Sequence, residues 1–128
     1  MRVDLQRGRY HARQAASVAD LEACQRLRAR CFFGTDGLDV DAFDAGWQHL
    51  IVEDGIGGPI VCTLRFQMCT GAQANAGYAA GFYDLQPFAQ LEGPLLEIGR
   101  FCCDPGRLDP HILRVAWGSV TQIVDAAK

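Results

Sequence analysis

The sequence predicts a single α+β domain in which a mostly antiparallel sheet is flanked by helices. Two observations predict this class. Apolar residues recur at helical spacing near each end of the chain, and the segments between alternate or run apolar as strands do. The chain has 128 residues, 49% of them apolar, which is enough for one domain over residues 1–128 with a single core. The expected element order is β-α-β-β-β-α.

The first third of the chain is predicted to hold a short strand and a helix. The strand is Tyr10–Ala15. The helix begins at Ser17, because Ser17 and Asp20 have the spacing of a capping box, and it ends at Gly34–Gly37. Apolar residues recur at helical spacing in this helix: Val18, Leu21, Cys24, Leu27 and Cys31 with Phe32.

The middle of the chain is predicted to form an antiparallel hairpin. Residues 38–47 are acidic and aromatic and are expected to form an ordered loop or a short helix. The two strands are His49–Glu53 and Ile60–Cys69, and they are joined by a turn at Asp54–Pro59. Alternation in the second strand points one set of side chains to one face: Ile60, Cys62, Leu64, Phe66 and Met68. The other face is mixed: Val61, Thr63, Arg65 and Gln67.

The last third is predicted to form a loop, a central strand and a closing helix. Residues 70–81 are rich in Gly and Ala and are expected to be a loop, and an apolar patch follows at 82–88. The strand is Leu95–Phe101, and Asp104–Gly106 breaks it. Asp109 and Pro110 open an amphipathic helix toward Lys128. One side of this helix is expected to be apolar: Leu113, Ala116, Trp117, Val120, Ile123 and Val124.

Composition and charge exclude several classes. The net charge of −3 is spread along the chain, which argues against a general nucleic-acid binder. No apolar run approaches the roughly 18 residues that span a bilayer, and no secretory signal is visible, so a cytoplasmic protein is expected, with membrane-surface contact left open. The six cysteines show no metal-ligand spacing, and buried free thiols are expected rather than a metal site or disulfides.

Charged residues inside the apolar strand 95–101 mark the expected chemical centre. Glu97 and Arg100 are costly there unless they are paired or used. If the strand is regular, the two side chains lie on opposite faces and share no task without a bulge. Arg100 is then expected to fix the acidic segment through Asp41 or Asp44, because arginine pairs with carboxylates at two points.

An ordered set of residues resembles a known family: Arg28, Phe32, Asp41, Asp44, Arg65, Phe82, Glu97 and Arg100. The set resembles the acyl-homoserine-lactone (autoinducer) synthases and the ornithine-acyl-ACP N-acyltransferases, both of the GNAT-like superfamily. The run Leu27–Phe32 is similar to the first helix of that family, and Thr63-Leu64-Arg65 to a strand of the synthases. Gly99 before Arg100 is typical of the ornithine branch, whereas the synthases more often carry Ser.

The resemblance implies a GNAT-like fold and also shows two departures. The loop 104–109 has only one glycine and departs from the usual phosphate-loop pattern Q/R-x-x-G-x-G/A, which favours an acyl carrier protein (ACP) donor over coenzyme A. Family members continue with another strand and helix, so the chain is expected to be a truncated or shortened member. The strand 95–101 would then keep an open edge, and a homodimer is expected to cover it, with four residues near the contact: Leu96, Ile98, Leu113 and Trp117.

The resemblance also implies roles for the site residues. Acyl transfer to an amine needs a base, and Glu97 is the best candidate; the alternative is an ion pair with Arg65 or Arg100. Arg65 is a candidate for binding the carboxylate of the acceptor, and the alternative is a surface arginine. Substrate contacts are also implied for Arg28, Phe32, Asp41, Asp44 and Phe82. Cys102 or Cys103 with His111 is a less favoured covalent alternative.

Arg26 and Arg30 lie one turn apart on the first helix and are candidates for contact with an acidic ACP; the alternative is a solvated helix face. The function implied is transfer of a fatty acyl group from ACP, as its phosphopantetheine thioester, or from acyl-CoA, to a small amino acid, namely ornithine, with no bound cofactor. One alternative is an autoinducer synthase that uses S-adenosylmethionine as acceptor. The other is a non-catalytic, truncated GNAT-like binding domain.

Overall fold

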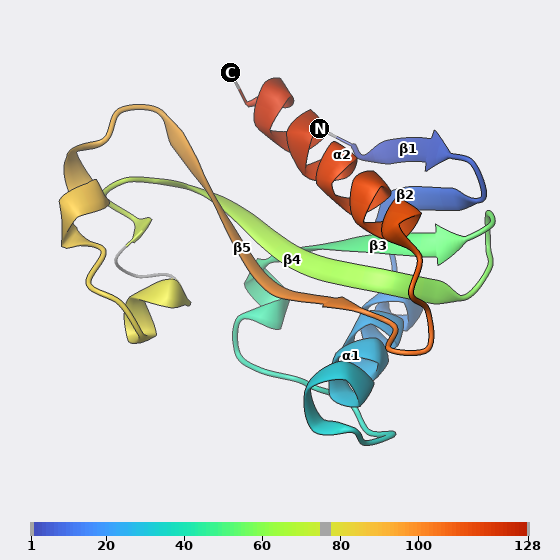
Figure 1. The fold of residues 1–128 in the computed structure, drawn as a ribbon. Helices are drawn as coiled ribbons and strands as arrows, with labels where there is room; N and C mark the ends of the chain where they lie inside the picture. The colour runs from blue at the N-terminus through green and yellow to red at the C-terminus, as the bar shows by residue number, and fades with distance from the viewer. Residues whose placement is uncertain (1, 75–77, 128) are drawn as a thin grey trace.

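The computed structural model describes residues 2–74 and 78–127 and confirms the α+β class. Five antiparallel strands lie side by side in the order β1-β2-β3-β4-β5, with α1 against one face and α2 against the other (Figure 1). The bounds are β1 Asp4–Arg7, β2 Tyr10–Gln14, α1 Val18–Phe33, β3 Gln48–Asp54, β4 Ile60–Thr70, β5 Pro94–Cys103 and α2 Pro110–Ala126.

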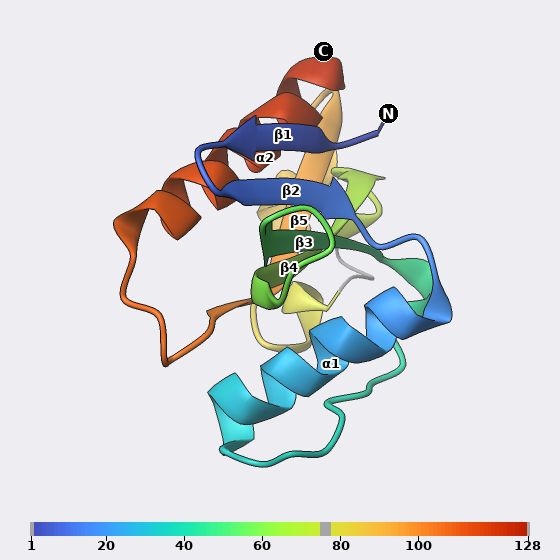
Figure 2. The ribbon, with the colours of Figure 1, turned by 90° about the vertical axis from the view of Figure 1, so that its right-hand side faces the viewer.

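The predicted order of elements does not include the strand β1. It pairs antiparallel with β2 through a turn at Gly8, whose φ is 59°. Only Leu5 of its four residues is buried, so the sequence carries no alternation there. Leu5 packs on α2 at Gly118, where a Cβ would stand 3.0 Å from a Leu5 methyl carbon. Contact with a distant helix therefore stabilises β1, and Figure 2 shows the two side by side.

The helix α1 begins and ends where the sequence predicts, but its buried face differs. The Ser17 hydroxyl accepts a hydrogen bond from the Asp20 amide, and Gly34 ends the helix in the left-handed region with φ 65°. Val18, the first residue of the predicted apolar pattern, is 73% exposed. The buried face instead combines apolar and polar residues: Cys24, Gln25, Leu27, Arg28 and Ala29. The cause is a charged cluster beneath α1, described below.

The main apolar core lies between the sheet and α2. The helix contributes Ile112, Val115, Ala116, Val120 and Ile123, which pack on buried residues of β1 to β4. The predicted apolar side is therefore only partly right: Leu113, Trp117 and Val124 are 43%, 49% and 41% exposed. Trp117 stacks on Phe101 of β5, with ring centroids 5.4 Å apart.

The strands β4 and β5 are longer than predicted, and the segment between them projects from the body (Figure 1). We call residues 71–93 the β4–β5 connection; its described parts are 71–74 and 78–93. Its described residues include the 3-10 turns Ala79–Gly81 and Gln86–Gln90, where the sequence predicts a loop and an apolar patch. Phe88 approaches Gly71 so closely that a Cβ there would lie 2.1 Å from the Phe88 carbonyl oxygen.

A bulge interrupts β5. Thr63 faces Cys102 and Arg65 faces Gly99, so three steps along β5 match two along β4. Arg100 lies in the bulge with φ 52°, a left-handed conformation that L-residues rarely adopt. In the described part of the chain β5 pairs with β4 alone, so its other edge is open; the homodimer stays a prediction. No described helix is both long and apolar enough to span a membrane.

Candidate functional site

A buried cluster of three arginines and three aspartates lies between α1 and the sheet. Its members come from four parts of the chain: Arg28 of α1, Asp39, Asp41 and Asp44 of the segment 38–47, Arg65 of β4 and Arg100 of β5. The charges balance, which is a condition for burying so many ionised groups together. The cluster fixes the 38–47 segment against both α1 and the sheet.

Arg28 is almost fully buried and is 1% exposed. Its Nε lies 2.9 Å from Asp39 Oδ2, and its Nη1 and Nη2 lie 2.7 and 3.2 Å from the two oxygens of Asp44. Gln25 donates to Asp44 as well, at 3.1 Å. Burial alone would raise the pKa of Asp44, but hydrogen bonds from Arg28, Gln25 and Arg65 lower it to about 2.

Arg65 is also enclosed, so the alternative of a surface arginine is wrong. Its Nη1 donates to Asp41 Oδ1 at 2.6 Å and to Asp44 Oδ1 at 3.0 Å. Among the described residues, its Nε and Nη2 have no hydrogen-bond partner. Three aromatic rings surround the guanidinium, with centroids 5.7, 5.3 and 5.0 Å from Cζ: Phe43, Trp47 and Tyr78. Direct contact of Arg28 or Arg65 with a substrate would therefore require the cluster to open.

The bulge brings Arg100 to the α1 side of the sheet, so the strand is not regular and the condition under which Glu97 and Arg100 would lie on opposite faces is not met. Arg100 Nη2 lies 3.5 Å from Asp41 Oδ2, which confirms the predicted contact with the acidic segment. Its Nε lies 3.2 Å from Asp39 Oδ2, an ion pair without hydrogen-bond alignment. The rings of Phe32 and Tyr78 cover its guanidinium at 5.8 and 5.5 Å.

Glu97 lies at the edge of this cluster, facing Gln67 across the strand pair. Its Oε1 accepts a hydrogen bond from the Ala79 amide at 2.7 Å, so the β4–β5 connection holds the carboxylate in place. In the described residues Glu97 forms no ion pair with Arg65 or Arg100, and the structural alternative predicted from sequence is not found. Its role as a base stays a prediction.

Two pockets meet at Glu97. The first, which we call the amide–aromatic pocket, has a volume of about 330 Å³ and is lined by Phe43, Trp47, Gln67, Met68, Cys69, Gln73 and Glu97. The second, the aliphatic pocket, has about 210 Å³ and is lined by Cys69, Ala74, Ala79, Leu85, Phe88, Leu95, Leu96 and Glu97. Cys69 and Glu97 are common to both, so the carboxylate stands in their shared wall.

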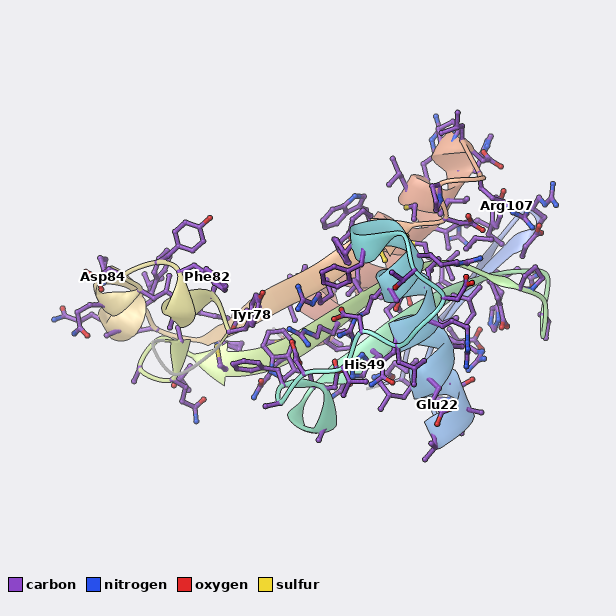
Figure 3. All side chains as sticks on the ribbon, turned by 90° about the horizontal axis from the view of Figure 1, so that it is seen from below. Glu22, His49, Tyr78, Phe82, Asp84 and Arg107 are labelled. Carbon is purple, nitrogen blue, oxygen red and sulfur yellow. The ribbon has the colours of Figure 1, made fainter. Side chains whose placement is uncertain are left out.

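The connection brings further residues to the site. Figure 3 shows Tyr78 on the side of the connection nearest the body, with Phe82 and Asp84 farther out. The Phe82 ring lies 5.2 Å from the Tyr78 ring and is 68% exposed, so it packs against Tyr78, whose ring in turn covers Arg65 and Arg100. Arg26 is exposed on α1, and Arg30 is half exposed, with Nη2 3.9 Å from Asp104.

The cysteines and histidines are arranged differently from a Cys–His catalytic pair. His111 Nδ1 lies 2.9 Å from Asp109 Oδ1, and no cysteine contact to it is found in the described part of the chain. Burial raises the pKa of the Cys102 thiol, which favours its neutral form. All six cysteines are free, and no cluster with the composition of a metal site occurs among the described residues.

Several site residues were missed from sequence. His49 lies under the cluster and its Nε2 is 3.0 Å from the Asp44 carbonyl oxygen; burial lowers its pKa. Asp39 and Tyr78 contact the arginines but lie outside the family pattern. Gln67 had a usable signal, because it follows Arg65 by two positions on the same face of a strand. Tyr78 had none, because its contacts cross the fold.

Comparison with known proteins gives the family. The acetyltransferase (GNAT) domain matches residues 23–118, which include the cluster and both pockets. L-ornithine N(alpha)-acyltransferase of Brucella abortus (strain 2308) is 33% identical over 130 residues, an alignment that covers 86% of this chain and 46% of that protein. The chain thus spans about half the length of this relative, and no solved structure matches. The family match over residues 23–118 and the α+β architecture agree, and the chain belongs to the GNAT acyltransferase family.

Proposed function

We propose that the chain carries the acyl-transfer site of an N-acyltransferase that moves a fatty acyl group from acyl-ACP to the amine of ornithine. The observation that carries this proposal is the position of Glu97. Its carboxylate is held by the Ala79 amide and stands between a polar pocket and an apolar one. The name of the Brucella relative and Gly99 before Arg100 support ornithine as the acceptor.

The chemistry follows from a carboxylate at this place. Because Oε1 is occupied by the Ala79 amide, Oε2 is the oxygen that takes a proton from the acceptor ammonium, directly or through water. The neutral amine attacks the thioester carbonyl and a tetrahedral intermediate forms. The C–S bond then breaks, the amine nitrogen loses its remaining extra proton, and the leaving thiolate takes up one proton, so that an amide and the thiol of the carrier are released. The bulge at Arg100–Phe101 leaves backbone groups outside the strand ladder, and an amide there is suited to the oxyanion.

The loop between β5 and α2 supports ACP over coenzyme A as the donor. The Gly106 amide donates to Asp104 Oδ1 and the Arg107 amide to the Asp104 carbonyl oxygen, both at 2.9 Å. At the start of α2, Asp109 Oδ1 accepts from the His111 amide, and Pro110 has no amide proton. A pyrophosphate would need these backbone amides as hydrogen-bond donors, and in this loop they already donate to groups of the protein. Exposed Arg26 and Arg30 suit the acidic surface of a carrier protein instead.

The test is an acyl-transfer assay with acyl-ACP and three sets of conditions: ornithine, S-adenosylmethionine, and no acceptor, with products identified by mass spectrometry. Formation of acyl-ornithine supports the proposal, and formation of an acyl-lactone supports an autoinducer synthase. If no acylated product forms, the chain is a binding domain. Glu97→Gln should lower turnover by about 100-fold, the usual scale for a general base. Glu92→Gln is the matched control, because Glu92 is an exposed glutamate of the same connection. Equal activity of the two variants would remove Glu97 from the mechanism.

A further inference from the structure

The amide–aromatic pocket has a charge pattern that selects its ligand. Glu97 is the one carboxylate among its lining residues in the described chain, and burial raises the pKa of the Cys69 thiol, which favours the neutral form of that group. No arginine, lysine or histidine of the described residues lines the pocket. Phe43 and Trp47 add ring surfaces to the lining, and the Arg65 guanidinium lies behind them, 5.7 and 5.3 Å from the ring centroids. The carboxylate of Glu97, with no cationic side chain in the lining itself, favours a ligand with a primary ammonium over an anion.

The glutamines of this pocket supply groups for a second polar part of the ligand. Gln73 Oε1 accepts a hydrogen bond from the Thr70 amide at 2.9 Å, which fixes the side-chain amide and leaves its NH2 group as a donor. Gln67 is exposed and faces Glu97 across the strand pair. Amide donors of this kind suit a carboxylate without adding charge. The volume of about 330 Å³ is at the small end for ligand pockets and fits an amino acid rather than a long chain.

The aliphatic pocket has the opposite character. Apart from Glu97 and Cys69 its lining consists of aliphatic and aromatic side chains, from the β4–β5 connection on one side and from Leu95 and Leu96 of β5 on the other. Burial of methylene groups there is favourable by about 0.8 kcal/mol each. A pocket of about 210 Å³ accommodates the first carbons of an alkyl chain and not its whole length.

We infer that the two pockets divide the substrates: an amino acid with a primary amine binds in the amide–aromatic pocket, and the carbons next to the thioester bind in the aliphatic pocket. The inference rests on the proposed function and adds the two subsites to it. Glu97, in the shared wall, then faces the amine on one side and the acyl carbonyl on the other. It also makes the β4–β5 connection the segment that selects the acyl group.

Two variants separate the subsites by binding alone, measured by calorimetry or ligand-observed NMR on the intact chain. The probes are L-ornithine and S-hexanoyl-N-acetylcysteamine, a thioester without phosphate. Gln73→Ala removes an amide donor from the amide–aromatic pocket. It should weaken the binding of ornithine by about tenfold, a difference of about 1.4 kcal/mol in binding free energy, and leave the binding of the thioester unchanged. Ala79→Leu fills the second pocket while keeping the backbone amide that holds Glu97. It should weaken the binding of the thioester by about tenfold and leave the binding of ornithine unchanged.

The outcomes distinguish the two proposals. The expected crossed pattern with no turnover in the acyl-transfer assay would keep the subsites and remove the proposed function. Turnover with both probes insensitive to both variants would remove the subsites and keep the function. The division into two subsites would also be overturned if one variant bound neither probe while its unfolding curve matched that of the parent chain. Failure of the parent chain to bind either probe would overturn it as well. Glu92→Gln serves as the control that changes neither pocket.

Discussion

Arg28 and Asp44 are joined at two points in the protein interior: Nη1 lies 2.7 Å from Oδ1 and Nη2 lies 3.2 Å from Oδ2. Both side chains are almost fully enclosed, at 1% and 4% exposed. The pair links the middle of α1 to the segment that also carries Asp39 and Asp41. A buried pair of this kind is weak support for overall stability, but breaking it leaves a charge without compensation. It therefore controls whether the segment 38–47 stays in place.

Replacement of Arg28 by methionine should lower the free energy of unfolding by about 3–5 kcal/mol, because Asp44 and Asp39 would keep buried charge without their main partner. Urea denaturation followed by circular dichroism measures this directly. Arg26→Met on the exposed face of the same helix is the matched control and should change the value by less than about 0.5 kcal/mol. Equal effects of the two substitutions would show that the cluster does not hold the fold.

The bulge predicts an unusual order of stability at Arg100. This residue has φ 52°, where an L side chain costs about 1–2 kcal/mol and glycine costs nothing comparable. Arg100→Ala removes the ion pairs and keeps the strain, whereas Arg100→Gly removes both. Arg100→Gly should therefore be more stable than Arg100→Ala by about 1 kcal/mol in thermal or urea unfolding.

The control for this comparison is Phe101, the next residue of β5, which lies outside the left-handed region. At Phe101 the order should reverse, because its φ is not positive and glycine within a strand is then less stable than alanine by roughly 0.5–1 kcal/mol. The same order of Ala and Gly at both positions would mean that β5 is regular in solution.

The β4–β5 connection should depend on Gly71. A Cβ at this residue would lie 2.1 Å from the Phe88 carbonyl oxygen, a backbone atom that cannot move without displacing the wall of the aliphatic pocket. Gly71→Ala should lower thioester affinity by about tenfold or more, because the wall shifts. Gly81→Ala is the control, since a Cβ at Gly81 would meet no described atom within 4 Å and the φ of this residue is not positive. Unchanged binding in both variants would show that the connection tolerates the contact.

Much of the fold is local enough to be predicted from the sequence. The alternation in residues 60–69 gives β4, and Ser17 and Gly34 give the ends of α1, because strand periodicity and caps are properties of neighbouring residues. The strand β1 is different, since one buried residue carries no periodicity and its stability comes from β2 and α2. The exposure of Val18 has a similar cause: α1 turns its polar residues toward the cluster.

The candidate site could be predicted as a set of residues but not as a geometry. The family pattern includes Arg28, Arg65 and Arg100 together with two of their three aspartate partners. It does not reveal that Arg100 changes face, because the bulge depends on register with β4 and not on residue type. It also misses Tyr78, whose ring covers two arginines from a distant segment. Contacts that cross the fold are set by tertiary packing, which spacing along one chain does not encode.

His11 should make stability depend on pH through three strands. Its Nδ1 lies 3.0 Å from Glu53 Oε1 of β3 and its Nε2 lies 2.6 Å from Asp4 Oδ1 of β1, while His11 itself is in β2. The hydrogen bond with Glu53 raises the pKa of His11; burial opposes this, and Asp4 adds to it. A folded-state pKa above the unfolded value of 6.5 means that the folded chain holds this proton more tightly.

The stabilisation is therefore complete below about pH 6.5 and is lost as the pH rises through the folded-state pKa. The comparison is between the parent chain and His11→Gln, by urea unfolding at about pH 5.5 and about pH 8.5. The advantage of the parent chain should be larger at the lower pH by roughly 1–2 kcal/mol, the scale of hydrogen bonds to charged groups. His49 titrates in the opposite sense, because burial lowers its pKa, but it is common to both chains and cancels in the difference. An advantage that grows with pH would mean that His11 is neutral between the two carboxylates.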